Sequence, residues 1–337
     1  MHRAGGKVLD IYFVNRNFDI SLPTHRETKY KIIMKKTYHL CLSGGDEIMF
    51  RDIEDYNRGF NCFALALHKT GSTGLVETFM STHTHQLIQT ADPAEFMYCF
   101  RLPYTMYFNR KYGRRGGLGE KRHFTMEIDG YYHTMAAASY VLRNALHHGV
   151  APIPYAYPHC SANSIFMKDM GKHPDDRLLK EKYHHRFLGK TAEYPERYKM
   201  SKSGIFLRES VLDIPQVENL FVTPRMFNFY MTRKSSEEWK AEQGKDQNGI
   251  SPIGIEQIER GVRTDAIDKM LMFENGKADY KKMSDIELCT EIDKVILPTL
   301  GKTSVYCMSE KEKCELAEHL YRQRHIGLAQ IRRGLAM

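Results

Sequence analysis

The 337-residue sequence lacks several features that would assign it to a common class of protein. Its seven cysteines are widely spaced and form no C-x-x-C pair, which argues against a zinc ribbon or a disulfide framework and indicates reduced thiols. No apolar run approaches the roughly 20 residues of a membrane span, and no secretory signal opens the chain. It also lacks a P-loop pattern, an internal repeat and a low-complexity tract. We therefore expect a soluble intracellular protein that does not work at a membrane.

The composition is that of a chain able to build a core. Hydrophobic residues make up 42% of the sequence and aromatic residues 11%, which is typical of globular rather than disordered proteins. The formal net charge is +8, which favours a polyanionic partner.

Four regions are expected along the chain. Residues 1–33 are polar and irregular and are interpreted as an N-terminal extension, with Met34 as an alternative natural start. Residues 34–166 carry the clearest strand and helix patterns and are expected to form a compact domain. Residues 167–250 are a charged connecting region, and 251–337 are expected to be helical.

Within the second region the patterns predict the order β-α-β-β-α-β-α. The expected strands cover 35–44, 74–80, 84–90 and 124–128, and the expected helices cover 50–71, 92–113 and 130–149. Such an order predicts an α+β domain with a mainly antiparallel sheet.

In the C-terminal region the sequence predicts three helical stretches. They are "IEQIERGVRTDAIDKMLMF", "MSDIELCTEIDKVILPTLG" and "MSEKEKCELAEHLYRQRHIGLAQIRRGLAM". The last contains a break at 325–327, which fits a helix-turn-helix, and a small bundle that only packs or dimerises fits it equally well.

Two histidines stand one residue apart in the expected strand "FMSTHTHQLIQT". Side chains at i and i+2 of a strand point to the same face, so His83 and His85 direct two imidazoles at one point. Thr84 faces the other side. A metal would explain the pair, although histidines are also common on half-buried strands, and two ligands are too few to hold an ion.

The helix at 130–149 offers a third ligand and a nucleophile. Tyr140 and Asn144 lie four residues apart and share one helix face. If that face packs beside the two histidines, the Asn144 oxygen completes a half-open metal site and the Tyr140 phenol lies one turn away. Imidazole ligands suit zinc, whereas phosphoryl chemistry commonly uses Mg²⁺ or Mn²⁺. Tyr131 and Tyr132 are rival nucleophiles, but neither precedes an amide by one turn.

The glycine-rich segment 110–124 combines positive charge with aromatic residues. A solvated surface loop is the simple interpretation, but such loops also bind single-stranded or hairpin DNA. The candidate DNA-binding residues are Arg110, Lys111, Arg114, Arg115, Lys121 and Arg122.

The stretch from about 37 to 166 resembles the single-tyrosine HUH transposases, and within them the REP-associated tyrosine transposase group. The stretches that carry the resemblance are "TYHLCLSG", "FRDIEDYNRGF", "FMSTHTHQLI", "YFNRKYGRRGGLGEKRHF" and "YVLRNALHHGVAPIPYAYPHCSANS". The resemblance implies a ferredoxin/RRM-like antiparallel sheet with helices on one face, as in HUH nuclease domains. It also implies that His83, His85 and Asn144 bind Mg²⁺ or Mn²⁺ and that Tyr140 is the nucleophile.

The function implied by this resemblance is that of a transposase-type single-stranded DNA endonuclease and strand transferase. It would form a 5′-phosphotyrosine on hairpin or repeat DNA, in the cytoplasm of a bacterial-type cell and at the nucleoid when bound. The sequence does not distinguish an active site assembled within one chain from one assembled by exchange of the tyrosine helix in a homodimer.

Two alternatives come from other classes of protein. Ala145 and Gly119 replace a proline and a phenylalanine that are common in the family, which would suit a domesticated, catalytically weak DNA-binding protein. An RNA-binding module of the same fold is the other alternative, and it would need aromatic residues on the sheet face where the two histidines stand.

Overall fold

The computed structural model describes residues 34–172, 178–189, 191–232, 236–262, 271–274, 277–280 and 283–337. Residues Met34–Met337 form one unit by their internal contacts. The expected N-terminal extension, 1–33, lies outside the described residues, whereas Met34, the alternative start, is the first described residue. Among the described residues no helix has both the length and the apolar character needed to cross a membrane.

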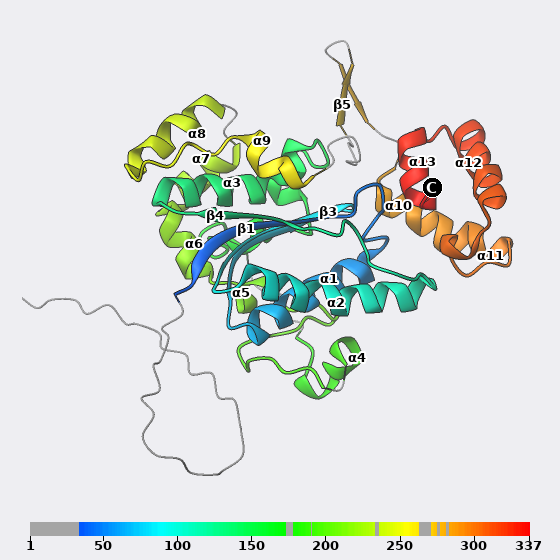
Figure 1. Cartoon of the computed structure of the whole chain (residues 1–337), viewed down its shortest axis with the longest axis horizontal. Coiled ribbons are helices and arrows are strands. Elements are labelled where there is room, and N and C mark those ends of the chain that lie inside the picture. Colours follow the sequence, from blue (N-terminus) through cyan, green and yellow to red (C-terminus); the bar gives the residue numbers. More distant parts are fainter. Residues whose placement is uncertain are drawn as a thin grey trace, which may run out of the picture. The chain divides into compact units, whose positions relative to one another are not determined.

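A four-stranded antiparallel sheet forms the centre of the unit (Figure 1). Its strands follow the order β2-β3-β1-β4. The strands are β1 (Lys36–Ser43), β2 (Thr73–Phe79), β3 (His83–Thr90) and β4 (Phe124–Ile128), and the helices between and after them are α1 (Ile53–Lys69), α2 (Pro93–Tyr112) and α3 (Tyr131–His147). The β-α-β-β-α-β-α order expected from the sequence is confirmed, and so is the α+β class.

Helices α1 and α2 cover one face of the sheet with an aromatic core. Asp52 caps α1 by accepting a hydrogen bond from the backbone of Asp55. The Phe63 ring of α1 lies 6.1 Å from Phe79 of β2 and 6.2 Å from Phe100 of α2, in edge-to-face contact with both. Phe63, Phe79 and Phe100 are at most 1% exposed, so this aromatic core excludes water.

Helix α3 covers the opposite face, which corrects the expectation of helices on one face only (Figure 1). Two neighbouring residues of β2 contact the helices on opposite faces of the sheet. Phe79 points to α1 and α2, whereas Thr78 donates a hydrogen bond of 2.6 Å to the carbonyl of Val141 in α3. The physical reason is that both sheet faces carry residues that must be buried. The sheet is therefore a middle layer.

The region expected to be a charged connection contributes to the same core. Its helices are α4 (His185–Leu188), α5 (Arg208–Val211), α6 (Ile214–Phe221), α7 (Pro224–Thr232) and α8 (Ser236–Gln243). Phe206, Phe221 and Phe227 are almost completely buried in one hydrophobic cluster with Phe63. The boundary expected at residue 166 does not coincide with an edge of this core.

The first of the three expected C-terminal helices begins as expected but is wrong at 271–273. Among the described residues of this stretch, α9 (Ile255–Ile258) and the turn η5 (Glu259–Gly261) are helical, whereas β5 (Leu271–Glu274) forms a hairpin with β6 (Lys277–Tyr280). Residues 263–270 lie outside the described residues. A short apolar run such as 271–273 fits a strand as well as a helix, and backbone pairing with β6 decides between them.

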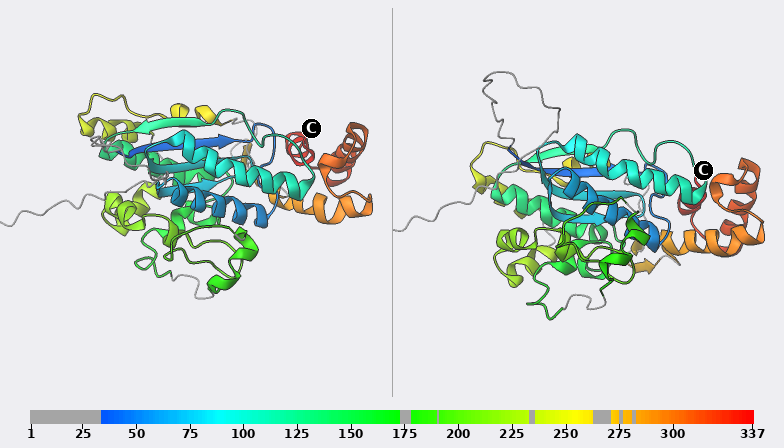
Figure 2. Two further views of the ribbon diagram at one scale, coloured as in Figure 1. Left: turned by 60° about the horizontal axis from the view of Figure 1, so that its bottom comes forward. Right: turned by 90° about the horizontal axis from the view of Figure 1, so that it is seen from below.

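The remaining helices form a second, smaller hydrophobic cluster, seen as a separate group in both views of Figure 2. They are α10 (Asp285–Glu291), the π-helical turn η7 (Ile292–Ile296), α11 (Leu297–Thr299), α12 (Glu310–Arg324) and α13 (Leu328–Leu335). Gln330 and Arg333 of α13 are buried and bonded to Met283 and Asp285. This arrangement favours the packed bundle over a helix-turn-helix that reads DNA with α13.

Candidate active site

The site begins with the two histidines of β3. His83 and His85 face α3 and are 1% and 0% exposed. Thr84 points to the other face, where it accepts a hydrogen bond of 2.6 Å from the Gln86 side chain. The alternation of the strand therefore separates Thr84 from the imidazoles, as expected from the period of two.

A third histidine, His39 of β1, joins the pair. In the β1–β3 register Cys41 lies opposite His85, so His39, two residues earlier, projects from the same face. Its Nε2 atom lies 2.9 Å from His85 Nδ1, at hydrogen-bond distance. The sequence analysis missed His39 because its place beside His85 depends on the strand register.

Helix α3 brings Tyr140 and Asn144 to these imidazoles. His83 Nε2 donates a hydrogen bond of 3.1 Å to Asn144 Oδ1, and Asn144 Nδ2 donates one of 3.2 Å to the Tyr140 hydroxyl. The Tyr140 ring stands edge-on to the His85 ring at 5.3 Å. Strand β3 and helix α3 thus bring together the four residues expected at the site from the sequence. His83 and Asn144 are 61 residues apart in the chain.

Burial keeps the imidazoles neutral. It lowers the pKa of His39 to about 3 and that of His83 to about 4, and it takes the pKa of His85 well below the ordinary value. Neighbouring histidines lower the His85 pKa further. Neutral imidazoles keep a nitrogen lone pair, which is the form that binds metals.

One feature of this cluster fits a bound cation. His85 Nε2 and His39 Nδ1 are buried and have no hydrogen-bond partner among the residues that the structure describes. An unpaired buried nitrogen costs about 1–3 kcal/mol, which a ligand could offset. Together with the Asn144 oxygen next to His83, the donor set suits a divalent ion with further positions left for substrate oxygens.

The structure adds a residue that the sequence analysis did not identify, Glu259 of η5. The Tyr140 hydroxyl donates a hydrogen bond of 3.2 Å to Glu259 Oε1. Burial first, and the Glu259 charge second, raise the pKa of Tyr140 well above its ordinary value. Tyr140 is only 3% exposed, so in this state the phenol is protonated and closed off from solvent.

The rival tyrosines lie at the other end of α3. Tyr131 is 42% exposed and donates a hydrogen bond to the Leu220 carbonyl. Tyr132 is half-buried and stacks edge-on with Tyr131. Of the three tyrosines of α3, Tyr140 is the one that contacts His83's partner, Asn144.

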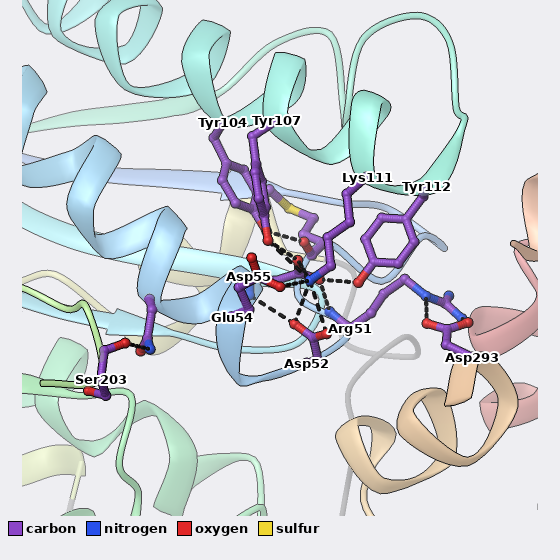
Figure 3. A network of polar contacts seen from close by, with 12 residues as sticks. Arg51, Asp52, Glu54, Asp55, Tyr104, Tyr107, Lys111, Tyr112, Ser203 and Asp293 are labelled. Atoms are coloured by element: carbon purple, nitrogen blue, oxygen red, sulfur yellow. Dashed lines mark hydrogen bonds and ion pairs between the residues drawn. The ribbon is translucent and has the colours of Figure 1, made fainter. Parts of the chain in front are cut away.

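The basic loop is divided between internal and exposed charges. Lys111 lies among the carboxylates of Asp52, Glu54 and Asp55 (Figure 3), and Arg114 forms a two-pronged ion pair with Glu47. These two cations are therefore partly neutralised within the chain. The four exposed candidates are Arg110, Arg115, Lys121 and Arg122.

Gly119 has a structural reason for standing in this loop. Its φ is +71°, and a Cβ atom there would lie 2.5 Å from the carbonyl oxygen of Ser43. That carbonyl accepts a hydrogen bond of 2.7 Å from the backbone of Glu120. A larger residue at 119 would break this connection between the loop and the end of β1.

Comparisons with known proteins give a likeness to a solved structure. No protein-family model matches the chain, and no curated protein matches it. A solved structure described as a REP-associated tyrosine transposase bound to a REP hairpin is similar to it, with 12% sequence identity and a TM-score of 0.34. The match covers 44% of this chain and 89% of that chain.

Proposed function

We propose that the protein is a metal-dependent, transposase-type endonuclease and strand transferase of single-stranded DNA, with Tyr140 as its nucleophile. The observation that carries the proposal is the series of contacts from His83 to Asn144 and from Asn144 to Tyr140. A phenol one hydrogen bond away from a candidate metal ligand lies beside the position where a metal would polarise a phosphate, which suits covalent phosphoryl transfer. The strand order, with the β-α-β-β-α-β succession, supports a ferredoxin/RRM-like domain as its scaffold.

In the proposed reaction the Tyr140 oxygen forms a bond to phosphorus and the bond from phosphorus to the 3′ oxygen breaks. The phenol proton is lost, the leaving oxygen takes up a proton to become a 3′-OH, and the DNA keeps a 5′-phosphotyrosine link. Attack by another 3′-OH reverses these steps. The phosphodiester energy is kept in the link, so ATP is not needed.

His83, His85 and Asn144 would hold the ion, for which we propose Mg²⁺ or Mn²⁺. When bound, it would supply charge to polarise the phosphate. His39 is then a positioning residue, because its contact with His85 Nδ1 fixes the orientation of that ring and leaves Nε2 for the ion.

The closed state of Tyr140 sets a condition on this function. A phosphodiester cannot reach a hydroxyl of a side chain that is 3% exposed. Glu259 must therefore release the hydroxyl, and the segment of α9 and η5 must shift, before DNA enters. The same burial favours one alternative, a catalytically weak protein that binds DNA through the exposed cations of the basic loop.

An RNA-binding module is less well supported. Such modules present aromatic residues on an open sheet face. Here the face in question carries His39, His83 and His85 under helix α3. Binding of DNA in competition with RNA would test this preference directly.

The test is a covalent-adduct assay with labelled single-stranded and hairpin oligonucleotides in Mn²⁺ or Mg²⁺, analysed on a denaturing protein gel. We expect a labelled band from the wild type and none from Tyr140→Phe or His83→Ala. Tyr131→Phe is the matched control, because it removes a hydroxyl from the same helix and should keep the band. Tight DNA binding without a band under any metal would favour the binding protein instead.

A further inference from the structure

A second group of metal-binding side chains lies where α3 ends. His147, His148 and Glu259 each offer one ligand atom, and these atoms lie within 4.8 Å of one another. His147 Nε2 is 2.7 Å from Glu259 Oε1, and His148 Nε2 is 3.6 Å from the same oxygen. None of the three belongs to the set proposed above for Mg²⁺ or Mn²⁺.

The burial of the three residues is that of a site open on one side. The side chains of His148 and Glu259 are 5% and 14% exposed, whereas that of His147 is 36% exposed. An ion could therefore enter from solvent at His147 and be held from inside by the other two. The open side would leave a position for water.

The group is close to the first site but separate from it. The His148 ring stands perpendicular to His83 at 5.6 Å, and the Tyr140 ring lies 6.0 Å from His147. Glu259 comes from a different part of the chain, 119 residues after Tyr140. An ion here would join the segment of α9 and η5 to the end of α3.

We propose that His147, His148 and Glu259 bind a zinc-class divalent cation that fastens the α9–η5 segment over helix α3. Two imidazoles and one carboxylate with an open fourth position form a donor set that Zn²⁺ prefers, whereas Mg²⁺ favours oxygen ligands. The ligand atoms already lie near one another, so little rearrangement is needed. This inference does not depend on Tyr140 being a nucleophile.

The test counts bound Co²⁺, a spectroscopic substitute for Zn²⁺, in the full-length chain. The reference protein, called the background, carries both Cys307→Ser and Cys314→Ser. These two thiols are exposed, and thiols also bind such ions. We expect His147→Ala and Glu259→Gln each to lose one equivalent of Co²⁺ relative to this background, together with its visible absorption band. Glu256→Gln in the same segment and His319→Ala on α12 are exposed controls and should lose neither.

The two sites can be told apart in the same experiment. His85→Ala should remove the ion of the first site and leave the second equivalent in place. If the first site binds no ion, the background protein binds one equivalent of Co²⁺ fewer, and Glu259→Gln is still expected to lose one equivalent relative to it. An unchanged count and spectrum in both His147→Ala and Glu259→Gln would overturn the proposal.

A second measurement covers the case in which a variant folds poorly. Hydrogen exchange of residues 255–262 should slow when Zn²⁺ is added to the background protein, because the ion fastens this segment. In His147→Ala, a change at a partly exposed side chain, the same addition should leave the exchange unchanged. Equal slowing in both proteins would contradict the site.

Discussion

Ser81 Oγ donates a hydrogen bond of 3.0 Å to Asp285 Oδ2, 204 residues further along the chain. Ser81 belongs to the turn between β2 and β3, two residues before His83, whereas Asp285 begins α10. Asp285 is fully buried and also binds the Arg333 guanidinium at 3.0 Å. The C-terminal helices thus hold the turn from which the histidine strand starts.

Replacing Asp285 by Asn should therefore strongly destabilise the fold. It leaves Arg333, whose side chain is 4% exposed, as a buried charge without its carboxylate, and breaking such a pair costs about 3–5 kcal/mol. Urea unfolding followed by circular dichroism measures the change. Glu318→Gln, which breaks an exposed pair with Arg322, should cost at most about 0.5 kcal/mol. A loss under about 1 kcal/mol for Asp285→Asn would contradict the structural role of the pair.

Glu259→Gln should shift the pH dependence of adduct formation toward lower pH. The Glu259 charge helps to hold the pKa of Tyr140 well above its ordinary value, and the phenolate is the attacking form. Each unit by which that pKa falls raises the phenolate fraction at pH 8 about tenfold. The rate of adduct formation between pH 6 and 10 measures the shift. Glu256→Gln should behave like the wild type, and a profile moved to higher pH would refute the assignment.

Acid should destabilise the protein through its buried histidines. The pKa of His39 and that of His159 are lowered to about 3, and that of His83 to about 4, so the unfolded chain binds protons below pH 6.5 while the folded chain does not. Their contribution to stability is complete above pH 6.5 and is lost as the pH falls toward 4. Each histidine removes about 1.4 kcal/mol per pH unit in this range.

Urea midpoints between pH 8 and 4.5 check this expectation. His39→Gln should flatten the decline because one of the titrating groups is gone. An equally steep decline in this variant would show that His39 does not take part. His319→Ala, at an exposed position, provides the matched control.

Removing three exposed cations of the basic loop should weaken DNA binding and its salt dependence. For single strands, each phosphate contact contributes about 0.7 to the slope of log K against log salt, so Arg115→Ala, Lys121→Ala and Arg122→Ala together should lower the slope by up to about 2. Fluorescence anisotropy at several salt concentrations measures it. Lys311→Ala, on α12 and 87% exposed, should have no effect. An unchanged slope in the triple variant would exclude the loop as a DNA contact.

The local part of this structure could be predicted from the sequence. Periods of two and of 3.6 residues indicated the elements from β1 to α3, although β2 and β3 are buried on both faces. The same periods placed His83 beside His85 and Tyr140 beside Asn144. Both relationships lie within a single strand or helix, where spacing alone fixes the geometry.

The rest depends on contacts between segments far apart in the sequence. His39 reaches His85 only through the β1–β3 register, and Glu259 reaches Tyr140 across 119 residues. The layer that α3 forms on the second sheet face could not be expected either. Thr78 contacts α3 and Phe79 contacts α1, and the sequence of the strand does not specify these partners. Spacing along one segment carries no information about such partners.

The position of Arg51 has a consequence for how the protein is made. Its guanidinium is completely buried, and the groups that satisfy it, the Asp293 carboxylate and the Gly334 carbonyl, follow 242 and 283 residues later. On the ribosome this charge must stay in water until those residues have been synthesised and have left the exit tunnel. Burial of Arg51 is thus a late event in folding, and a chain that has not yet released residues 293–334 exposes surface that favours misfolding.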